Sequence, residues 1–132
     1  MSKDGLKVGI TTDIVDSVKY HKGVANYIKC LVKNLAKIQN THDYYLIHFH
    51  RDSDAIYRLG LNEIIVPPFS ILPSEISKLL TNAIRAKKLL TGLDVIHTTA
   101  PRLPYFPLYS LPNAKKVLTV HAMDLYIPHW LR

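Results

Sequence analysis

The chain has 132 residues, 48% of them hydrophobic, which is enough for one domain with a substantial core and too short for two. Its formal net charge of +7 favours an anionic partner: a phosphorylated substrate, a nucleic acid or a membrane surface. No run of about 18 apolar residues occurs and no signal-peptide region precedes the first strand, so we expect a cytoplasmic protein. The lone Cys30 excludes an internal disulfide, and we interpret it as a small apolar packing residue.

The first predicted element is an apolar strand, residues 6–12, which is followed by a polar loop that ends at Lys22-Gly23. An amphipathic helix starts there and continues to about residue 39, with an apolar stripe that should face a core. The first N–H groups of a helix lack intrahelical partners and stabilise an anion, and no Ser, Thr, Asp or Asn directly precedes this helix to cap them. We interpret the helix start as a phosphate-binding site or, alternatively, as a tight turn shaped by Gly23.

The rest of the chain continues this alternation of strands and helices. A second long helix is predicted to end at Gly92, and a proline-rich loop precedes the last strand. Continuous apolar runs are typical of a parallel sheet buried on both faces, so we predict an α/β, Rossmann-like three-layer domain with a mostly parallel sheet. Ligands of such sheets bind beyond the carboxyl ends of the strands. The further strands are predicted at residues 44–50, 63–66, 94–97 and 117–121, with a short helical segment within 52–61.

The order and spacing of these segments carry a family resemblance. It rests on Gly23 at the helix start, on Asp94-Val95-Ile96-His97, and on Val117-Leu118-Thr119-Val120-His121. Over nearly its whole length the chain resembles the N-terminal domain of GT-B fold glycosyltransferases of family 4 (glycosyl transferases group 1). The resemblance implies the acceptor-binding half of a retaining hexosyltransferase, which transfers a sugar from a nucleotide-diphosphate sugar to a sugar or lipid-linked acceptor.

The resemblance also implies roles for particular residues. Gly23 matches the glycine of the loop that approaches the donor diphosphate, with Lys22 standing where the family often has a second glycine, and both are expected to bind the diphosphate. His121 matches the catalytic-site histidine beside the donor sugar. His121 would orient that sugar by hydrogen bonding. Thr98 and Thr99 fall in the acceptor-side loop. No cofactor or metal is implied, because free N–H groups of the helix would stabilise the departing diphosphate.

The chain stops at Arg132, shortly after the last predicted strand, and lacks the paired glutamates with which the family holds a nucleotide sugar. We therefore expect residues 1–132 to be a truncated, acceptor-side domain that does not catalyse transfer by itself. A C-terminal GT-B domain, in the same chain or in a partner, would supply the nucleotide-sugar site.

A basic stripe supports a second hypothesis. Four lysines spaced seven, four and four residues apart share one side of the first helix: Lys22, Lys29, Lys33 and Lys37. They would let a non-catalytic module bind an anionic membrane or nucleic acid, whereas for the enzyme we expect only peripheral contact with the inner face of a membrane. No G-x-G-x-x-G follows the first strand, which disfavours a dinucleotide oxidoreductase. His48 and His50 lack further ligands at usable spacing, so no metal site is predicted.

Overall fold

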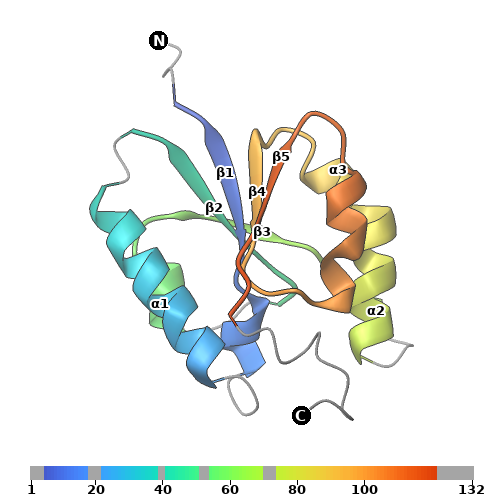
Figure 1. Ribbon diagram of the computed structural model, residues 1–132, viewed down its shortest axis with the longest axis horizontal. Coiled ribbons are helices and arrows are strands. Elements are labelled where there is room, and N and C mark those ends of the chain that lie inside the picture. Colours follow the sequence, from blue (N-terminus) through green and yellow to red (C-terminus); the bar gives the residue numbers. More distant parts are fainter. Residues whose placement is uncertain (1–4, 18–21, 39–40, 51–53, 70–73, 122–132) are drawn as a thin grey trace.

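The computed structural model describes residues 5–17, 22–38, 41–50, 54–69 and 74–121, and it contains one sheet of five parallel strands (Figure 1). The strands lie in the order β3-β2-β1-β4-β5, so the order reverses between β1 and β4. This confirms the predicted α/β, Rossmann-like fold, with every strand parallel. The strands are β1 (Lys7–Thr11), β2 (Asp43–His48), β3 (Asn62–Ile65), β4 (Val95–Thr98) and β5 (Lys115–Leu118).

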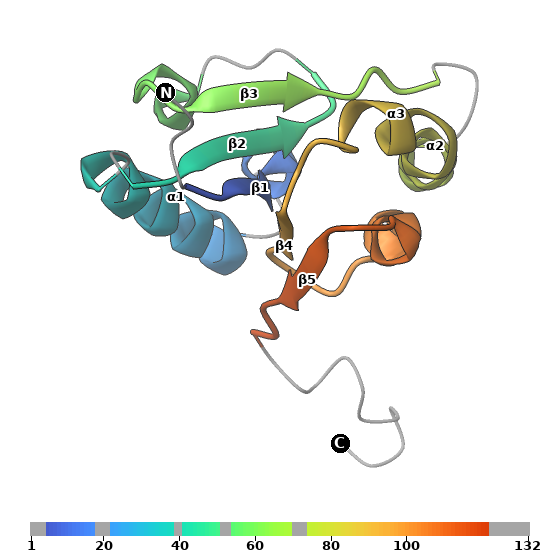
Figure 2. The ribbon, with the colours of Figure 1, turned by 90° about the horizontal axis from the view of Figure 1, so that it is seen from above.

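Helices cover both faces of the sheet and make the predicted three layers. The helix α1 (Lys22–Lys37) lies on one face, whereas α2 (Ser74–Thr81) and the 3₁₀-helix η4 (Leu103–Ser110) lie together on the other (Figure 1 and Figure 2). Within the described segments, no helix has both the length and the apolar character needed to span a membrane. Shorter helical segments complete the connections: η1 (Asp13–Ser17), η2 (Ala55–Arg58), the π-helical η3 (Asn82–Ala86) and α3 (Lys87–Leu89).

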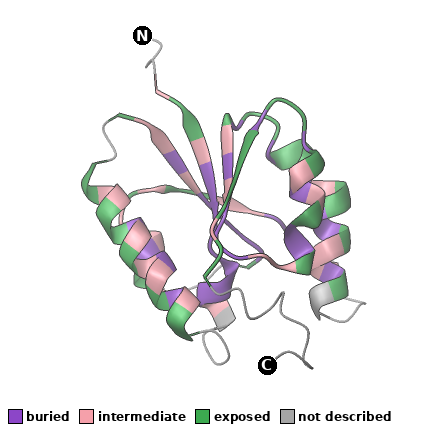
Figure 3. Ribbon diagram, viewed as in Figure 1, coloured by how far each residue is buried: buried purple, intermediate pink, exposed green. Residues whose placement is uncertain are grey.

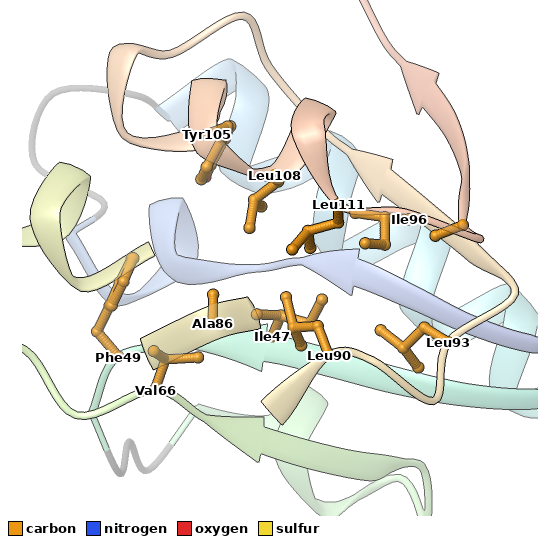
Figure 4. Packing of buried hydrophobic residues seen from close by; sticks show 11 residues of the cluster. Ile47, Phe49, Val66, Ala86, Leu90, Leu93, Ile96, Tyr105, Leu108 and Leu111 are labelled. Atoms are coloured by element: carbon orange, nitrogen blue, oxygen red, sulfur yellow. The ribbon is translucent and has the colours of Figure 1, made fainter. Parts of the chain in front are cut away.

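Each face of the sheet has its own hydrophobic core. On the α1 face, Ile28 and Val32 of the helix belong to one buried cluster with Leu46 of β2. On the other face, Ile47 of β2 joins a second cluster that includes Leu90 (Figure 4). The neighbouring residues Leu46 and Ile47 thus point to opposite faces and are both buried, as the continuous apolar run predicts for an interior strand.

The proline-rich segment that we predicted as a loop is the helix η4. A 3₁₀-helix has three residues per turn, so side chains three positions apart share one side. Tyr105, Leu108 and Leu111 have this spacing, and all three are buried in the core (Figure 4). The prolines favour irregular structure, but the apolar spacing of three residues is the feature that matches the observed helix, because it places these side chains together on the side that faces the core.

The second long helix has apolar residues at helical spacing that predict a buried stripe, namely Ile76, Leu79, Leu80, Ala83, Ile84 and Leu90, but the structure buries a different side of α2. It runs through α2, the π-helical η3 and α3 in succession. Ile76, Leu80 and Ile84, which have helical spacing, are exposed. The side that faces the protein carries the polar residues Ser77, Thr81 and Asn82 in its first part, and the core residues Ala86 and Leu90 after them.

Three smaller predictions about burial are also wrong. Cys30 lies on the exposed side of α1 and is not a packing residue. Ile38 is 57% exposed, because α1 ends at Lys37 and the apolar stripe ends with it. All four residues of β5 are exposed, because this strand forms the edge of the sheet (Figure 3).

Candidate functional site at the carboxyl edge of the sheet

The start of α1 lies at the carboxyl edge of the sheet, as predicted, with Lys22 and Gly23 both exposed. A Cβ atom built on Gly23 would meet nothing within 4 Å, and Gly23 does not have a positive φ. The fold therefore needs a glycine here neither for packing nor for backbone conformation, which argues against the tight-turn interpretation. Residues 18–21 lie outside the described segments, so the uncapped state of the helix stays a prediction.

His121 follows β5 and is brought to this edge beside α1. Its Nε2 lies 2.6 Å from the carbonyl oxygen of Thr99, so Nε2–H donates a hydrogen bond to that carbonyl. The ring of Tyr27, on α1, packs edge-on against the imidazole with the ring centroids 4.7 Å apart. With the proton on Nε2, the uncharged form of the ring has Nδ1 as a hydrogen-bond acceptor. Tyr27 lies four residues, or about one helical turn, after Gly23, so its contact with His121 places the imidazole close to the start of α1.

Thr98 and Thr99, predicted on the acceptor side, are fully buried at the switch point of the sheet. The Thr99 hydroxyl donates to the carbonyl of Thr11 at 2.8 Å, and the Thr99 N–H donates to the Thr11 hydroxyl at 3.0 Å. The Thr98 hydroxyl shares a hydrogen bond of 2.7 Å with the hydroxyl of Tyr109. Thr99 thus joins the ends of β1 and β4, whereas Thr98 links β4 to η4. Thr99 reaches the site through the carbonyl that orients His121. Contact of either threonine with an acceptor stays a prediction.

His97 and Thr119 form a second layer behind His121. The Nε2 atom of His97 lies 2.6 Å from the Thr119 hydroxyl, which also shares a hydrogen bond of 3.2 Å with the hydroxyl of Tyr27. Burial lowers the pKa of His97, and the charge of nearby His121 lowers that pKa further. His97 is therefore held neutral. The apolar pattern of α1 assigns Tyr27 to the stripe that faces the core and misses this second role, although its spacing from Gly23 is a usable signal.

On the opposite face of the sheet, the loop after β1 carries the buried Asp13. The Tyr105 hydroxyl donates to Asp13 Oδ1, and Arg102 Nη1 donates to Asp13 Oδ2 at 2.7 Å. Lys78 Nζ, from α2, lies 3.6 Å from the same Oδ2 atom. Burial and then the charge of Asp13 raise the pKa of Tyr105 well above its ordinary value, so its hydroxyl stays a donor. No sequence signal links Lys78 with Arg102, and the pattern analysis missed this cluster.

The carboxylates around His48 form a different cluster, on the α1 face. His48 is fully buried, with Nδ1 3.1 Å from Asp16 Oδ2 and Nε2 2.7 Å from Glu63 Oε1. Its ring stacks on Tyr57 at a centroid distance of 4.1 Å. Burial alone would lower the pKa of His48, but the hydrogen bonds to Asp16 and Glu63 and the charges of both raise it above its ordinary value. Both ring nitrogens are thus occupied by carboxylates.

The lysine stripe on α1 is only partly exposed. Lys29 forms an ion pair with Asp54 of the η2 segment, with Nζ 3.4 Å from Oδ2. The other three lysines of the stripe are exposed: Lys22, Lys33 and Lys37. Binding of a membrane by this stripe stays a prediction.

A parallel sheet of order β3-β2-β1-β4-β5 defines a Rossmann-like domain, a class of fold whose ligands bind at the switch point of the sheet. Residues 21–132 match the profile of the family Glycosyltransferase Family 4, and the chain belongs to this family. This confirms the predicted resemblance. Searches of curated proteins and of solved structures gave no significant match.

Proposed function

We propose that this domain is the acceptor-binding, N-terminal half of a retaining glycosyltransferase that uses a nucleotide-diphosphate sugar. The observation that carries the proposal is Gly23, an exposed glycine at the start of α1 with open space around it and no structural need for a glycine. A residue without a Cβ lets a phosphate approach the N–H groups of the helix closely. Membership of the glycosyltransferase family supports a diphosphate as the anion.

The α1 start would act on the charge that develops during transfer. When the bond between sugar and diphosphate breaks, negative charge grows on the departing diphosphate. The N–H groups of α1 and the exposed cation of Lys22 would stabilise that charge more strongly in the transition state than in the ground state. This role requires no metal from the N-terminal domain. A C-terminal domain would hold the nucleotide and bring the diphosphate to this edge.

His121 would orient the donor sugar. The Thr99 carbonyl fixes the proton on Nε2, so Nδ1 would accept a hydrogen bond from a sugar hydroxyl. The edge-on contact with Tyr27 would keep the ring in this orientation. In this role His121 positions the sugar and does not act as a general base.

The test replaces Gly23 by alanine in the complete protein with its C-terminal domain, and measures release of nucleoside diphosphate from a panel of nucleotide sugars. Gly23→Ala should lower kcat/KM about tenfold or more, because a Cβ would displace the diphosphate by about 1 Å from the N–H groups. The stability of the fold should change by no more than about 1 kcal/mol, because the Cβ meets no neighbouring atom.

Gly92 offers a matched control for this substitution. A Cβ on Gly92 would also meet nothing within 4 Å, and its φ is not positive, but it lies in the turn after α3, away from the carboxyl edge. Gly92→Ala should leave both activity and stability unchanged. Wild-type activity in Gly23→Ala, or an equal loss in both variants, would falsify the proposed role of the α1 start.

A further inference from the structure

The helix α2 and the η3 segment that continues it have a polar inner side and an apolar outer side. Between positions 76 and 84 the buried residues are polar, namely Ser77, Thr81 and Asn82. Every exposed residue in the same stretch is apolar, and these residues are Ile76, Leu80, Ala83 and Ile84. The three large side chains among them are 48%, 37% and 62% exposed. This arrangement is the reverse of an ordinary surface helix, whose outer side is polar.

The neighbouring 3₁₀-helix η4 also has exposed apolar side chains. Leu103 and Phe106 are three residues apart, so they share one side of this helix, and both are exposed. The helices α2 and η4 pack side by side in the layer on one face of the sheet (Figure 1 and Figure 2). Five large apolar side chains of this layer therefore contact solvent, and we call them the α2–η4 surface: Ile76, Leu80, Ile84, Leu103 and Phe106.

The helix on the other face of the sheet provides a comparison within the same molecule. The exposed residues of α1 are polar or small: Lys22, Gly23, Asn26, Cys30, Lys33, Asn34 and Lys37. Such a side is well solvated by water. Large aliphatic and aromatic side chains gathered on one layer are poorly solvated, and a patch of this kind marks a surface that associates with something apolar.

The part of the chain that contains the α2–η4 surface is also strongly basic. The first 75 residues hold nine Lys and Arg and eight Asp and Glu, whereas residues 76–121 hold seven Lys and Arg and one acid, Asp94. Lys87 and Lys88 are exposed just after the apolar side of the helix, and neither forms an ion pair with another described residue. A second copy of the chain would bring the same positive charge against itself, which disfavours self-association through this surface.

We propose that the α2–η4 surface docks on an anionic lipid bilayer. A helix with an apolar side and flanking lysines lies in the interface between lipid head groups and acyl chains. Ile76, Leu80 and Ile84 enter the acyl boundary, while Lys87 and Lys88 contact anionic head groups. A nucleic acid would attract the lysines but would gain nothing from a row of aliphatic side chains. None of these residues belongs to the candidate site, so the membrane contact is independent of the proposed function.

The test measures co-sedimentation of the chain with vesicles of phosphatidylcholine that contain a minor share of phosphatidylglycerol, and with vesicles of phosphatidylcholine alone. The chain should prefer the anionic vesicles, and rising salt should weaken this binding. Leu80→Gln combined with Ile84→Gln should lower the partition coefficient about tenfold or more, because two aliphatic side chains no longer leave water. Lys87→Gln combined with Lys88→Gln should lower it by a similar factor on the anionic vesicles alone.

Matched control variants lie on the α1 face. Ile38 is 57% exposed, close to the 62% of Ile84, and Lys33 and Lys37 are exposed lysines about one helical turn apart. Ile38→Gln, and Lys33→Gln combined with Lys37→Gln, should bind vesicles as the wild type does. Thermal denaturation should show every variant folded, because each replaced side chain is exposed.

A measurement on the wild type needs no variant. A spin-labelled lipid in the anionic vesicles should broaden the NMR methyl signals of Ile84 and leave those of Ile38 sharp. Equal broadening of both signals, or equal loss of vesicle binding in the α1 and α2 variants, overturns the proposal. So does a dimer of the wild type that Leu80→Gln with Ile84→Gln dissociates in analytical ultracentrifugation, since the occupant is then a second copy. Binding of duplex DNA through Lys87 and Lys88 without vesicle binding overturns it in favour of nucleic acid.

Discussion

The two charged clusters beneath the carboxyl edge of the sheet are built in opposite ways. On the α1 face, one imidazole, that of His48, lies between two carboxylates, and both ring nitrogens have a partner. On the α2 face, one carboxylate, that of Asp13, lies between the cations of Lys78 and Arg102 and also accepts from the Tyr105 hydroxyl. In the first cluster each nitrogen of one ring has its own carboxylate, whereas in the second several donors converge on a single carboxylate. A group on which several buried donors converge should cost the most stability to remove.

The largest expected effect comes from removing the carboxylate of the second cluster. Asp13→Asn removes the carboxylate that two largely buried cations share and should lower the free energy of unfolding by about 3–5 kcal/mol, measured by urea denaturation. Asp54→Asn removes one half of the more exposed pair with Lys29 and should cost less than about 1 kcal/mol. Equal effects of the two substitutions would contradict the contrast between the clusters.

A smaller effect is expected from the first cluster, where it should depend on pH. The pKa of His48 is raised in the folded state, so its ion pairs contribute fully below its ordinary pKa of 6.5 and their contribution is lost as the pH rises through the folded pKa. His48→Gln should therefore destabilise the domain by about 1.5–3 kcal/mol in mild acid and by less in alkali. Denaturation curves of both proteins across this pH range provide the measurement.

Glu63→Gln gives an independent check on the same cluster. It removes one of the two negative charges while keeping a group that can accept the hydrogen bond from Nε2. The pKa of His48, followed by NMR of its ring protons, should fall in this variant. An unchanged pKa would show that Glu63, which is partly exposed, does not help to hold the proton.

The smallest expected effect concerns His97, whose linkage to stability has the opposite sign. Burial and then the charge of His121 lower the pKa of His97, so the neutral ring contributes stability above pH 6.5 and this contribution is lost as the pH falls through the folded pKa. His121→Gln removes the nearby charge and should raise the pKa of His97, as NMR titration would report. If that pKa does not move, the two rings do not interact and the layer behind His121 is not coupled to it.

The two long helices show how far periodicity predicts burial. In α1 the prediction holds for Ile28 and Val32, which are buried, whereas Ile38 lies beyond the end of the helix and is exposed. In the α2 segment it fails, because the buried side makes hydrogen bonds to irregular backbone. The Thr81 hydroxyl accepts from the Phe69 N–H at 3.3 Å, and the Asn82 amide donates to the Pro104 carbonyl at 2.5 Å. Those backbone groups need partners once buried, so polar residues are used where a helix pattern alone predicts apolar ones.

Some features of the candidate site could likewise be predicted from the sequence, and others could not. Gly23 and His121 were predicted, because each follows the end of an element that the pattern locates and both fit the family's order of segments. The contacts of His121 with the Thr99 carbonyl and with Tyr27 could not be predicted from the sequence, because they depend on how α1 and the loop after β4 approach each other. The roles expected of Thr98 and Thr99 rested on their position in a loop, whereas their burial follows from the pairing of β1 with β4.

The sequence by itself determined the alternation of strands and helices, the parallel sheet, the exposed glycine at the start of the first helix and the family. These are properties of neighbouring residues, because periodicity and turn chemistry act over a few positions. Only the tertiary structure decided which charges meet. Asp13, Lys78 and Arg102 belong to three separate connections, and the order of strands in the sheet brings them together at one oxygen atom. Coulomb energy depends on distance in space and on burial, and a linear pattern records neither.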